Sequence, residues 1–193
     1  MKKRIGPVDK IIPIPIALVV SGSFENPNIT TVGKVGIVAS DPPVIAISLR
    51  KDRYSLELIR KTKEFSVNTP SSQYFRETDY CGLVSGRDYD KLSDIGMTPL
   101  KGSTIDAPLL EECPYNLECK VRNEIVLGDW ILLLADICEV YIDEDKLLDS
   151  EKGIIDEKKV APLVYCGFVK EYRVLGEAVG RGFSDGWAIK REK

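Results

Sequence analysis

The chain has 193 residues, of which 44% are hydrophobic and 30% are charged, and its formal net charge is −3. This length and composition are typical of a globular protein with one hydrophobic core, so we expect a single domain over residues 1–193. The acidic balance argues against nucleic acid as a partner, because binding to a phosphate backbone requires a broad basic face.

The N-terminus combines a basic start, Met1–Arg4, with an apolar stretch, Ile11–Val20. Pro13 and Pro15 interrupt this stretch, no small-residue cleavage pattern follows it, and it is too short to span a bilayer. We therefore predict neither a signal peptide nor a membrane segment, no membrane partner, and a cytoplasmic location. The same region predicts the first strand, over Ile16–Ser23.

Strand-type segments dominate the rest of the chain. Runs rich in Val, Ile, Leu and Tyr, bounded by polar or turn-forming residues, predict further strands. These strands are Val35–Ala39, Val44–Leu49, Glu64–Asn68, Leu117–Val126, Trp130–Ile142 and Val160–Val169.

The clearest hairpin signal joins Tyr115–Val126 to Trp130–Tyr141 through Leu127-Gly128-Asp129. Apolar and charged residues alternate along the first of these strands, which indicates one buried and one solvated face. The second strand is apolar on both faces from Trp130 to Ile137. This favours a central barrel strand or one that also contacts another subunit.

Helical segments are few and short. Tyr54–Thr62 predicts an amphipathic helix, while Pro70–Arg76 and Asp88–Asp94 each predict a turn or two. The charged stretch Asp143–Lys159 is typical of a solvated loop or short helix, and the glycine-rich tail Gly176–Gly186 is either mobile or docked across a partner subunit. Many strands with long connections favour a barrel over an alternating parallel sheet.

A candidate anion site lies where the strand Val44–Leu49 leads into the helix Tyr54–Thr62. Arg50, Lys51 and Arg53 place three cations beside the start of that helix. A helix N-terminus offers unpaired backbone N–H groups and partial positive charge, both of which attract anions. Ser55 would act there as N-cap or as a phosphate donor, and the pattern therefore predicts a site for a phosphate-bearing cofactor.

Histidine is absent from the chain, which excludes imidazole-based acid–base catalysis, a Ser-His-Asp triad and every histidine-containing zinc site. The five cysteines are scattered without a C-x-x-C motif, so we predict no metal site and reduced, mostly structural thiols. They are Cys81, Cys113, Cys119, Cys138 and Cys166.

The segments N-I-T-T-V (28–32), D-P-P-V-I-A-I-S-L-R (41–50), R-Y-S (53–55) and E-F-S-V-N (64–68) resemble the flavin reductase-like, FMN-binding split-barrel family. Flavoredoxins and archaeal ferric reductases belong to that family. The resemblance covers roughly Pro13 to Tyr141, and it implies a mainly β fold, an FMN-binding split β-barrel of Greek-key type with a few short helices. We also expect a homodimer, because the strand Trp130–Ile137 is apolar on both faces and the glycine-rich tail would lack support on its own.

The resemblance implies that residues 28–32 and 48–50 line the flavin ring and ribityl chain, and that residues 53–55 bind the phosphate. A second cofactor-facing loop would carry Ser85 and Lys91. The full set of expected cofactor contacts is Asn28, Thr30, Thr31, Val32, Ser48, Leu49, Arg50, Arg53, Tyr54, Ser55, Asn68, Ser85 and Lys91. No catalytic side chain is expected, because the flavin brings the redox chemistry.

Each of these residues also has a purely structural interpretation. The Asn/Thr run would be a polar loop between strands, Arg50 and Arg53 ordinary surface charges, and Ser55 a plain N-cap. Many members of the family carry a histidine linked to nicotinamide binding where this chain has Trp130.

The function implied by the resemblance is an NAD(P)H-dependent flavin or ferric-type reductase, with NADH or NADPH as co-substrate, which passes electrons from FMN to an external acceptor. The donor or acceptor is a small molecule or a redox protein. The alternatives are a flavoredoxin-like electron carrier without NAD(P)H activity of its own, and a split-barrel protein that binds its ligand without catalysis.

Overall fold

The computed structural model describes residues 1–191, and its centre is a seven-stranded antiparallel sheet. Neighbouring strands in this sheet follow the order β3-β2-β6-β9-β10-β5-β4. The strands are β2 (Ala17–Gly22), β3 (Pro27–Val32), β4 (Val35–Ser40), β5 (Pro43–Arg50), β6 (Glu64–Thr69), β9 (Tyr115–Leu127) and β10 (Trp130–Ile142).

The sheet curves around one core, so that its two ends approach each other. Val32 of β3, at one end, belongs to the same buried cluster as Ile45 and Ile47 of β5, near the other end. Phe65 of β6 is fully buried in that cluster. The predicted split β-barrel is therefore confirmed, and residues of β3 contact residues of β5.

The predicted hairpin is confirmed, because β9 and β10 pair along 13 residues each around a turn at Gly128 and Asp129. In the sheet β10 lies between β9 and β5, so it is the central strand that the sequence favoured. Its residues Ile131, Leu133 and Ala135 are buried, while those on the other face, from Trp130 to Leu134, are half-buried. Its register with β5 places Trp130 opposite Arg50.

Helix α1 (Tyr54–Thr62) has its predicted bounds. The turn predicted over Pro70–Arg76 is instead a 3-10 turn, η1 (Ser72–Tyr74), followed by a full helix, α2 (Phe75–Leu83). Helix α3 (Lys91–Ile95) occupies the end of the third predicted segment. Leu18, Ile29 and Cys81 form a second core between α2 and the outer face of β2 and β3.

The strand predicted over Val160–Val169 is wrong in its bounds. The chain there ends a short helix and then forms β13 (Val164–Cys166), which pairs with β14 (Glu171–Arg173) and with β1 (Ile14–Pro15) from the N-terminus. The remaining short elements are β7 (Pro99–Leu100), β8 (Leu109–Leu110), η2 (Glu144–Lys146), β11 (Leu147–Asp149), β12 (Ile154–Ile155), α4 (Glu157–Val160), η3 (Asp185–Trp187) and α5 (Ala188–Arg191).

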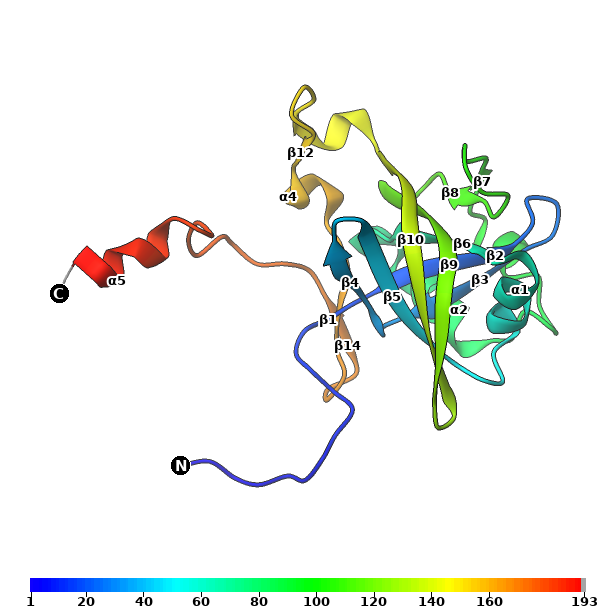
Figure 1. Ribbon diagram of the computed structural model, residues 1–193, viewed down its shortest axis with the longest axis horizontal. Coiled ribbons are helices and arrows are strands. Elements are labelled where there is room, and N and C mark those ends of the chain that lie inside the picture. The colour runs from blue at the N-terminus through cyan, green and yellow to red at the C-terminus, as the bar shows by residue number, and fades with distance from the viewer. Residues whose placement is uncertain (192–193) are drawn as a thin grey trace.

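Both ends of the chain extend away from the barrel (Figure 1). Val179 and Phe183 in the C-terminal tail are fully exposed. Within residues 1–191, no helix has the length and apolar character needed to cross a membrane.

Candidate active site

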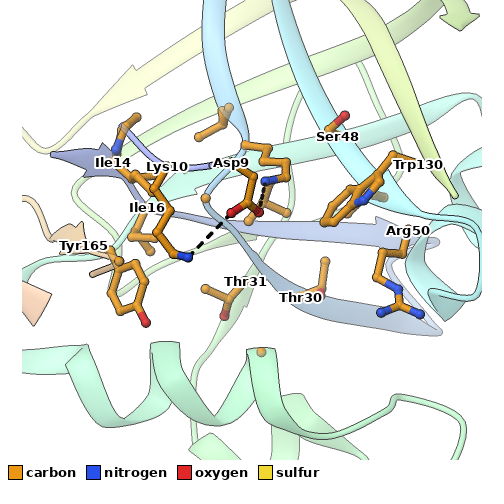
Figure 2. Close-up of a pocket in the computed structure, with 18 of the residues that line it drawn as sticks. Asp9, Lys10, Ile14, Ile16, Thr30, Thr31, Ser48, Arg50, Trp130 and Tyr165 are labelled. Atoms are coloured by element: carbon orange, nitrogen blue, oxygen red, sulfur yellow. Dashed lines mark hydrogen bonds and ion pairs between the residues drawn. The ribbon is translucent and has the colours of Figure 1, made fainter. Parts of the chain in front are cut away.

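A cavity of about 590 Å³, here called the wide cavity, lies where β3 and β5 meet. Thr30–Val32 of β3 line one wall, and Ser48–Arg50 of β5 line another. Figure 2 shows Trp130 and Arg50 together at one end of this cavity and Tyr165 at the other. Its volume is in the range of pockets that hold cofactors and drug-sized ligands.

A second cavity of about 250 Å³, here called the basic cavity, adjoins the first. Thr30, Arg50 and Arg53 line both cavities, so a ligand with two parts can extend from one into the other. All predicted cofactor contacts except Asn68 line one of these two cavities. The structure thus brings together residues that lie up to 63 positions apart, from Asn28 to Lys91.

Arginines supply two of the cations in the basic cavity. Arg50 is ion-paired with Asp52 at 3.1 Å and is half exposed. Arg53 has no carboxylate partner within residues 1–191, and its guanidinium donates long hydrogen bonds of 3.4 and 3.5 Å to the carbonyl of Gly82. Arg53 is therefore the better placed of the two to bind an anion.

Lys91 supplies a third cation and is only 4% exposed. Its Nζ donates to the carbonyl oxygens of Cys81, at 3.2 Å, and Val84, at 3.5 Å, and no ion pair to a carboxylate is present in the described part of the chain. Burial lowers its pKa to about 8, and the nearby charge of Arg53 also lowers it. A buried amine without a counter-ion strongly favours an anion in this cavity.

Helix α1 begins at this cavity. Arg53 is the N-cap residue, and its side chain does not cap the helix, so backbone N–H groups of the first turn face the cavity region. Ser55 is not the N-cap that the sequence predicted, because it is the second residue of the helix. Its Oγ accepts a hydrogen bond of 2.7 Å from Nδ2 of Asn28, which joins α1 to β3.

The loop with Ser85 and Gly86 closes the basic cavity. Oγ of Ser85 accepts a hydrogen bond of 3.2 Å from the backbone N–H of Arg87, which forms a turn and leaves the Ser85 hydroxyl proton available for a ligand. A Cβ on Gly86 would lie 1.8 Å from Oδ1 of Asn28. Only glycine allows this loop to approach β3 so closely.

We expect Gly86→Ala to lower cofactor affinity about tenfold, because the loop must move and the hydrogen bond from Asn28 to Ser55 is lost. Titration of the purified apo-protein with FMN, followed by fluorescence quenching, measures this change. Gly36→Ala is the matched control, since a Cβ there meets nothing within 4 Å. Unchanged affinity in Gly86→Ala would contradict the proposed role of the loop.

The sequence allowed two interpretations of the Asn/Thr run, a polar loop or a cofactor-binding segment. In the structure this run is part of strand β3, at an end of the sheet. An end strand keeps one row of backbone N–H and C=O groups without a strand partner. Thr30 is buried, while the hydroxyl of Thr31 donates to the carbonyl of Thr78 in α2. The unpaired backbone groups of β3 can therefore serve as hydrogen-bond partners for a ligand in the wide cavity.

Trp130 forms the opposite wall together with Ser48 and Leu49. The ammonium of Lys34 lies 4.7 Å from the centroid of the Trp130 ring. Lys34 also pairs with Asp9 at 3.5 Å. The indole thus has a fixed cationic neighbour at the edge of the cavity.

The sequence did not predict the residues that close the wide cavity from the termini. Asp9, Lys10 and Ile14 of the N-terminal segment line it, as do Tyr165 and Tyr172 of the β13–β14 hairpin. The pairing of β1 with β13 brings these two regions together across the whole length of the chain. No local pattern in the sequence carries that information.

The expected role of Asn68 as a cofactor contact does not agree with the structure. Its side chain is fully buried and lines neither cavity. Nδ2 donates to the carbonyl of Leu18 and to Oγ of Ser66, at 3.0 and 2.9 Å. Oδ1 accepts from the N–H of Leu110 and from Nδ2 of Asn116, at 3.1 and 2.9 Å. Every hydrogen-bonding position of the amide is therefore used inside the protein.

We expect Asn68→Ala to lower the free energy of unfolding by about 1–3 kcal/mol, because it leaves buried donors and acceptors unpaired. FMN affinity should remain within twofold of the parent. Urea unfolding measures the first quantity and flavin titration the second. Asn123→Ala, at an exposed position of β9, is the control and should change neither. A large loss of FMN affinity in folded Asn68→Ala would restore the original hypothesis.

No cluster of potential metal ligands is found within the described residues. All five cysteines are free thiols, and three of them, Cys81, Cys113 and Cys119, are buried. Burial raises the pKa of Cys81 to about 11, so this thiol is protonated and poorly nucleophilic near neutral pH.

The fold and the two cavities define the class of the protein. It is a split-barrel protein with a small cavity lined by cationic side chains, joined to a wider cavity. The chain belongs to the flavin reductase-like family, since the family model "Flavin reductase like domain" matches residues 9–175.

Two solved structures are similar to the chain over nearly its whole length. Flavoredoxin of Desulfovibrio vulgaris (Miyazaki F) is 35% identical with a TM-score of 0.90, covering 96% of this chain and 100% of that one. Flavoredoxin from Methanosarcina acetivorans is 30% identical with a TM-score of 0.91, covering 98% and 99%. Among curated proteins, an NADH-dependent FMN reductase, AsuE2, of Streptomyces nodosus subsp. asukaensis is 25% identical over 134 residues, which are 69% of this chain and 71% of that protein.

Proposed function

We propose that the protein is an FMN-dependent oxidoreductase that takes electrons from NADH or NADPH and passes them to an external acceptor. The observation that carries this proposal is the buried, carboxylate-free Lys91 in a basic cavity that opens into the wide cavity. A dianionic phosphate fits the basic cavity, and a planar ring fits the wide cavity. The similarity to an enzyme named as an NADH-dependent FMN reductase supports the choice of donor.

The side chains of this protein would divide the work of holding FMN. Arg53, Lys91 and the start of α1 would bind the phosphate, with the hydroxyls of Ser55 and Ser85 as further partners. When bound, FMN supplies the redox chemistry, accepting a hydride or single electrons and releasing them to an acceptor.

The ring would lie in the wide cavity against the backbone of β3. Thr30 and Val32 would line one side of it, and Ser48 and Leu49 the other, with Trp130 at the edge. These walls orient the ring and exclude water from it, and positioning of this kind is the main contribution a protein makes to hydride transfer. No histidine is available to move a proton, so acid–base catalysis by imidazole does not contribute.

FMN, rather than FAD, is the proposed cofactor, because the chain has no G-x-G-x-x-G fingerprint for a dinucleotide. We expect the purified protein to be yellow and to release stoichiometric FMN on heat denaturation, identified by chromatography. Stoichiometric FAD or haem in the released fraction would overturn this assignment.

We further propose a homodimer in the cytoplasm. The end strand β4 exposes Ile37 and Val38, which are 58% and 57% accessible, and the tail exposes Val179 and Phe183. A dimer would cover such apolar surface, with obligate interfaces burying on the order of 2,000 Å² or more. Five free thiols suit a reducing compartment. Light scattering at micromolar concentration should give twice the chain mass, and a monomer would contradict the proposal.

Anaerobic stopped-flow mixing tests the enzymatic function. The FMN-loaded protein should be bleached by NADH or NADPH much faster than free FMN at the same concentration, because the walls of the cavity align the two rings. If neither nucleotide reduces the bound flavin faster than free FMN, the protein is an electron carrier that receives electrons from a redox protein.

A further inference from the structure

The wide cavity extends beyond the walls assigned to FMN. Its far end, here called the tyrosine end, lies across the cavity from Arg50 and Trp130 (Figure 2). The proposed function gives this end no ligand. The tyrosine end is lined by Ile14, Ile16, Tyr165, Gly167 and Tyr172.

The lining of the tyrosine end is aromatic and aliphatic, with one charged side chain, Lys10, beside Tyr165 and Gly167. The rings of Tyr165 and Tyr172 have their centroids 5.2 Å apart and are tilted by 52°, as in other favourable aromatic pairs. The hydroxyl of Tyr172 donates to Oδ1 of Asp79 at 3.0 Å, and burial raises its pKa, so it stays neutral. Nζ of Lys10 lies 3.6 Å from Asp9, and Lys34 pairs with the same carboxylate at 3.5 Å.

This end of the cavity is a formed wall and not a loose loop. Tyr165 pairs with Ile14 across the β1–β13 ladder and with Tyr172 across the β13–β14 ladder. The hydrogen bond from Tyr172 to Asp79 fixes the hairpin to helix α2. A ligand therefore meets a preorganised surface, which lowers the entropic cost of binding.

We propose that the tyrosine end binds a para-quinone, the electron acceptor of the bound cofactor, an inference that rests on the proposed function. A planar, uncharged ring matches the tyrosine pair and the isoleucine side chains. The Tyr165 hydroxyl has no hydrogen-bond partner within residues 1–191, and it can donate to a quinone carbonyl.

The reaction balances as a two-electron reduction. The quinone gains two electrons and two protons and leaves as the hydroquinone. Both electrons come from reduced FMN, which returns to its oxidised form, and one proton comes from reduced FMN and the other from solvent.

Equilibrium dialysis of the oxidised protein against duroquinone tests the binding step. This fully substituted quinone cannot add to a thiol such as the exposed Cys138. We expect Tyr165→Ala to raise the Kd for duroquinone about tenfold, and Tyr165→Phe, which keeps the ring, to stay within about threefold of the parent. Tyr89→Ala, at an exposed tyrosine outside the cavities, should leave the Kd unchanged.

Reoxidation of dithionite-reduced protein tests the electron transfer. Tyr165→Ala should slow reoxidation by duroquinone about tenfold, while reoxidation by ferricyanide, which has no ring to stack, stays within twofold. An unchanged Kd, or equal slowing with both acceptors, would overturn the proposal. Tyr165→Leu carries the same expectations if Tyr165→Ala does not fold. Neither measurement uses NADH or NADPH, so failure of the proposed donor leaves this test valid.

Discussion

Replacing Arg53 with Ala is expected to lower the affinity for FMN by about 10- to 100-fold. A charge-assisted hydrogen bond to phosphate contributes roughly 1.5–3 kcal/mol, and tenfold in affinity corresponds to about 1.4 kcal/mol. Arg53 lines both cavities and has no carboxylate partner within the described residues, so its charge is available to the ligand. Titration of the apo-protein with FMN measures the effect.

Two further variants make this measurement specific. Arg60→Ala removes an arginine from the same helix, but Arg60 pairs with Glu124 outside both cavities, so FMN affinity should not change. Arg50→Ala should cost less than Arg53→Ala, because Arg50 already pairs with the exposed Asp52. Parent-like affinity in Arg53→Ala, with the protein folded by circular dichroism, would show that the phosphate is bound elsewhere.

Local patterns in the sequence were sufficient to predict most of the barrel. Alternating or continuous apolar runs predicted six of the seven strands of the large sheet, and the Gly128-Asp129 turn predicted its longest hairpin. Strand β3 was missed, because its Asn/Thr run has no apolar pattern. Helix α2 was predicted too short, because its buried residues Thr78 and Cys81 give a weak apolar face and Gly82 lies inside it. Propensity is a weak guide where tertiary packing decides the structure.

Residues of the candidate site that lie close together in the sequence were predictable, and residues that come from distant segments were not. The proposed phosphate region includes Arg50, Arg53 and Ser55, which are close together in the sequence, and the structure places them at the basic cavity. Tyr165 and Asp9 reach the wide cavity through the pairing of β1 with β13, which are about 150 residues apart in the sequence. The buried hydrogen bonds of Asn68 were not predictable, because its partners Leu110 and Asn116 lie more than 40 residues away.

The two cavities differ in the elements that line them. Most residues of the basic cavity come from helices and loops, and backbone N–H groups at the start of α1 with flexible cationic side chains suit a compact anion. Most residues of the wide cavity come from strands, which supply flat walls whose alternate side chains point to one face. The junction at Thr30 belongs to both cavities.

Lys91 should make the affinity for FMN depend on pH in the alkaline range. In the free protein its pKa is lowered to about 8, chiefly by burial. A bound phosphate would raise this pKa by opposite charge, so the protonated amine binds phosphate more tightly than the neutral amine. Lys91 should therefore give its full contribution to the affinity below about pH 8. The affinity should fall as the pH rises above 8, by up to about tenfold per pH unit, until the pKa of the complex is reached.

Lys91→Met keeps the length of the buried side chain and removes its charge. We expect it to lower FMN affinity about 100-fold or more at pH 7, because truncating one partner of a buried charge pair costs about 2–5 kcal/mol. Between pH 7 and 10 the FMN affinity of Lys91→Met should not show the decrease that deprotonation of this amine causes in the parent. Lys61→Met is the control, since Lys61 pairs with Glu57 on the outer face of α1 and should leave the parent profile intact. A Lys91→Met profile that falls as steeply as the parent's would assign the titration to another group, and an affinity within threefold of the parent at pH 7 would remove Lys91 from the phosphate site.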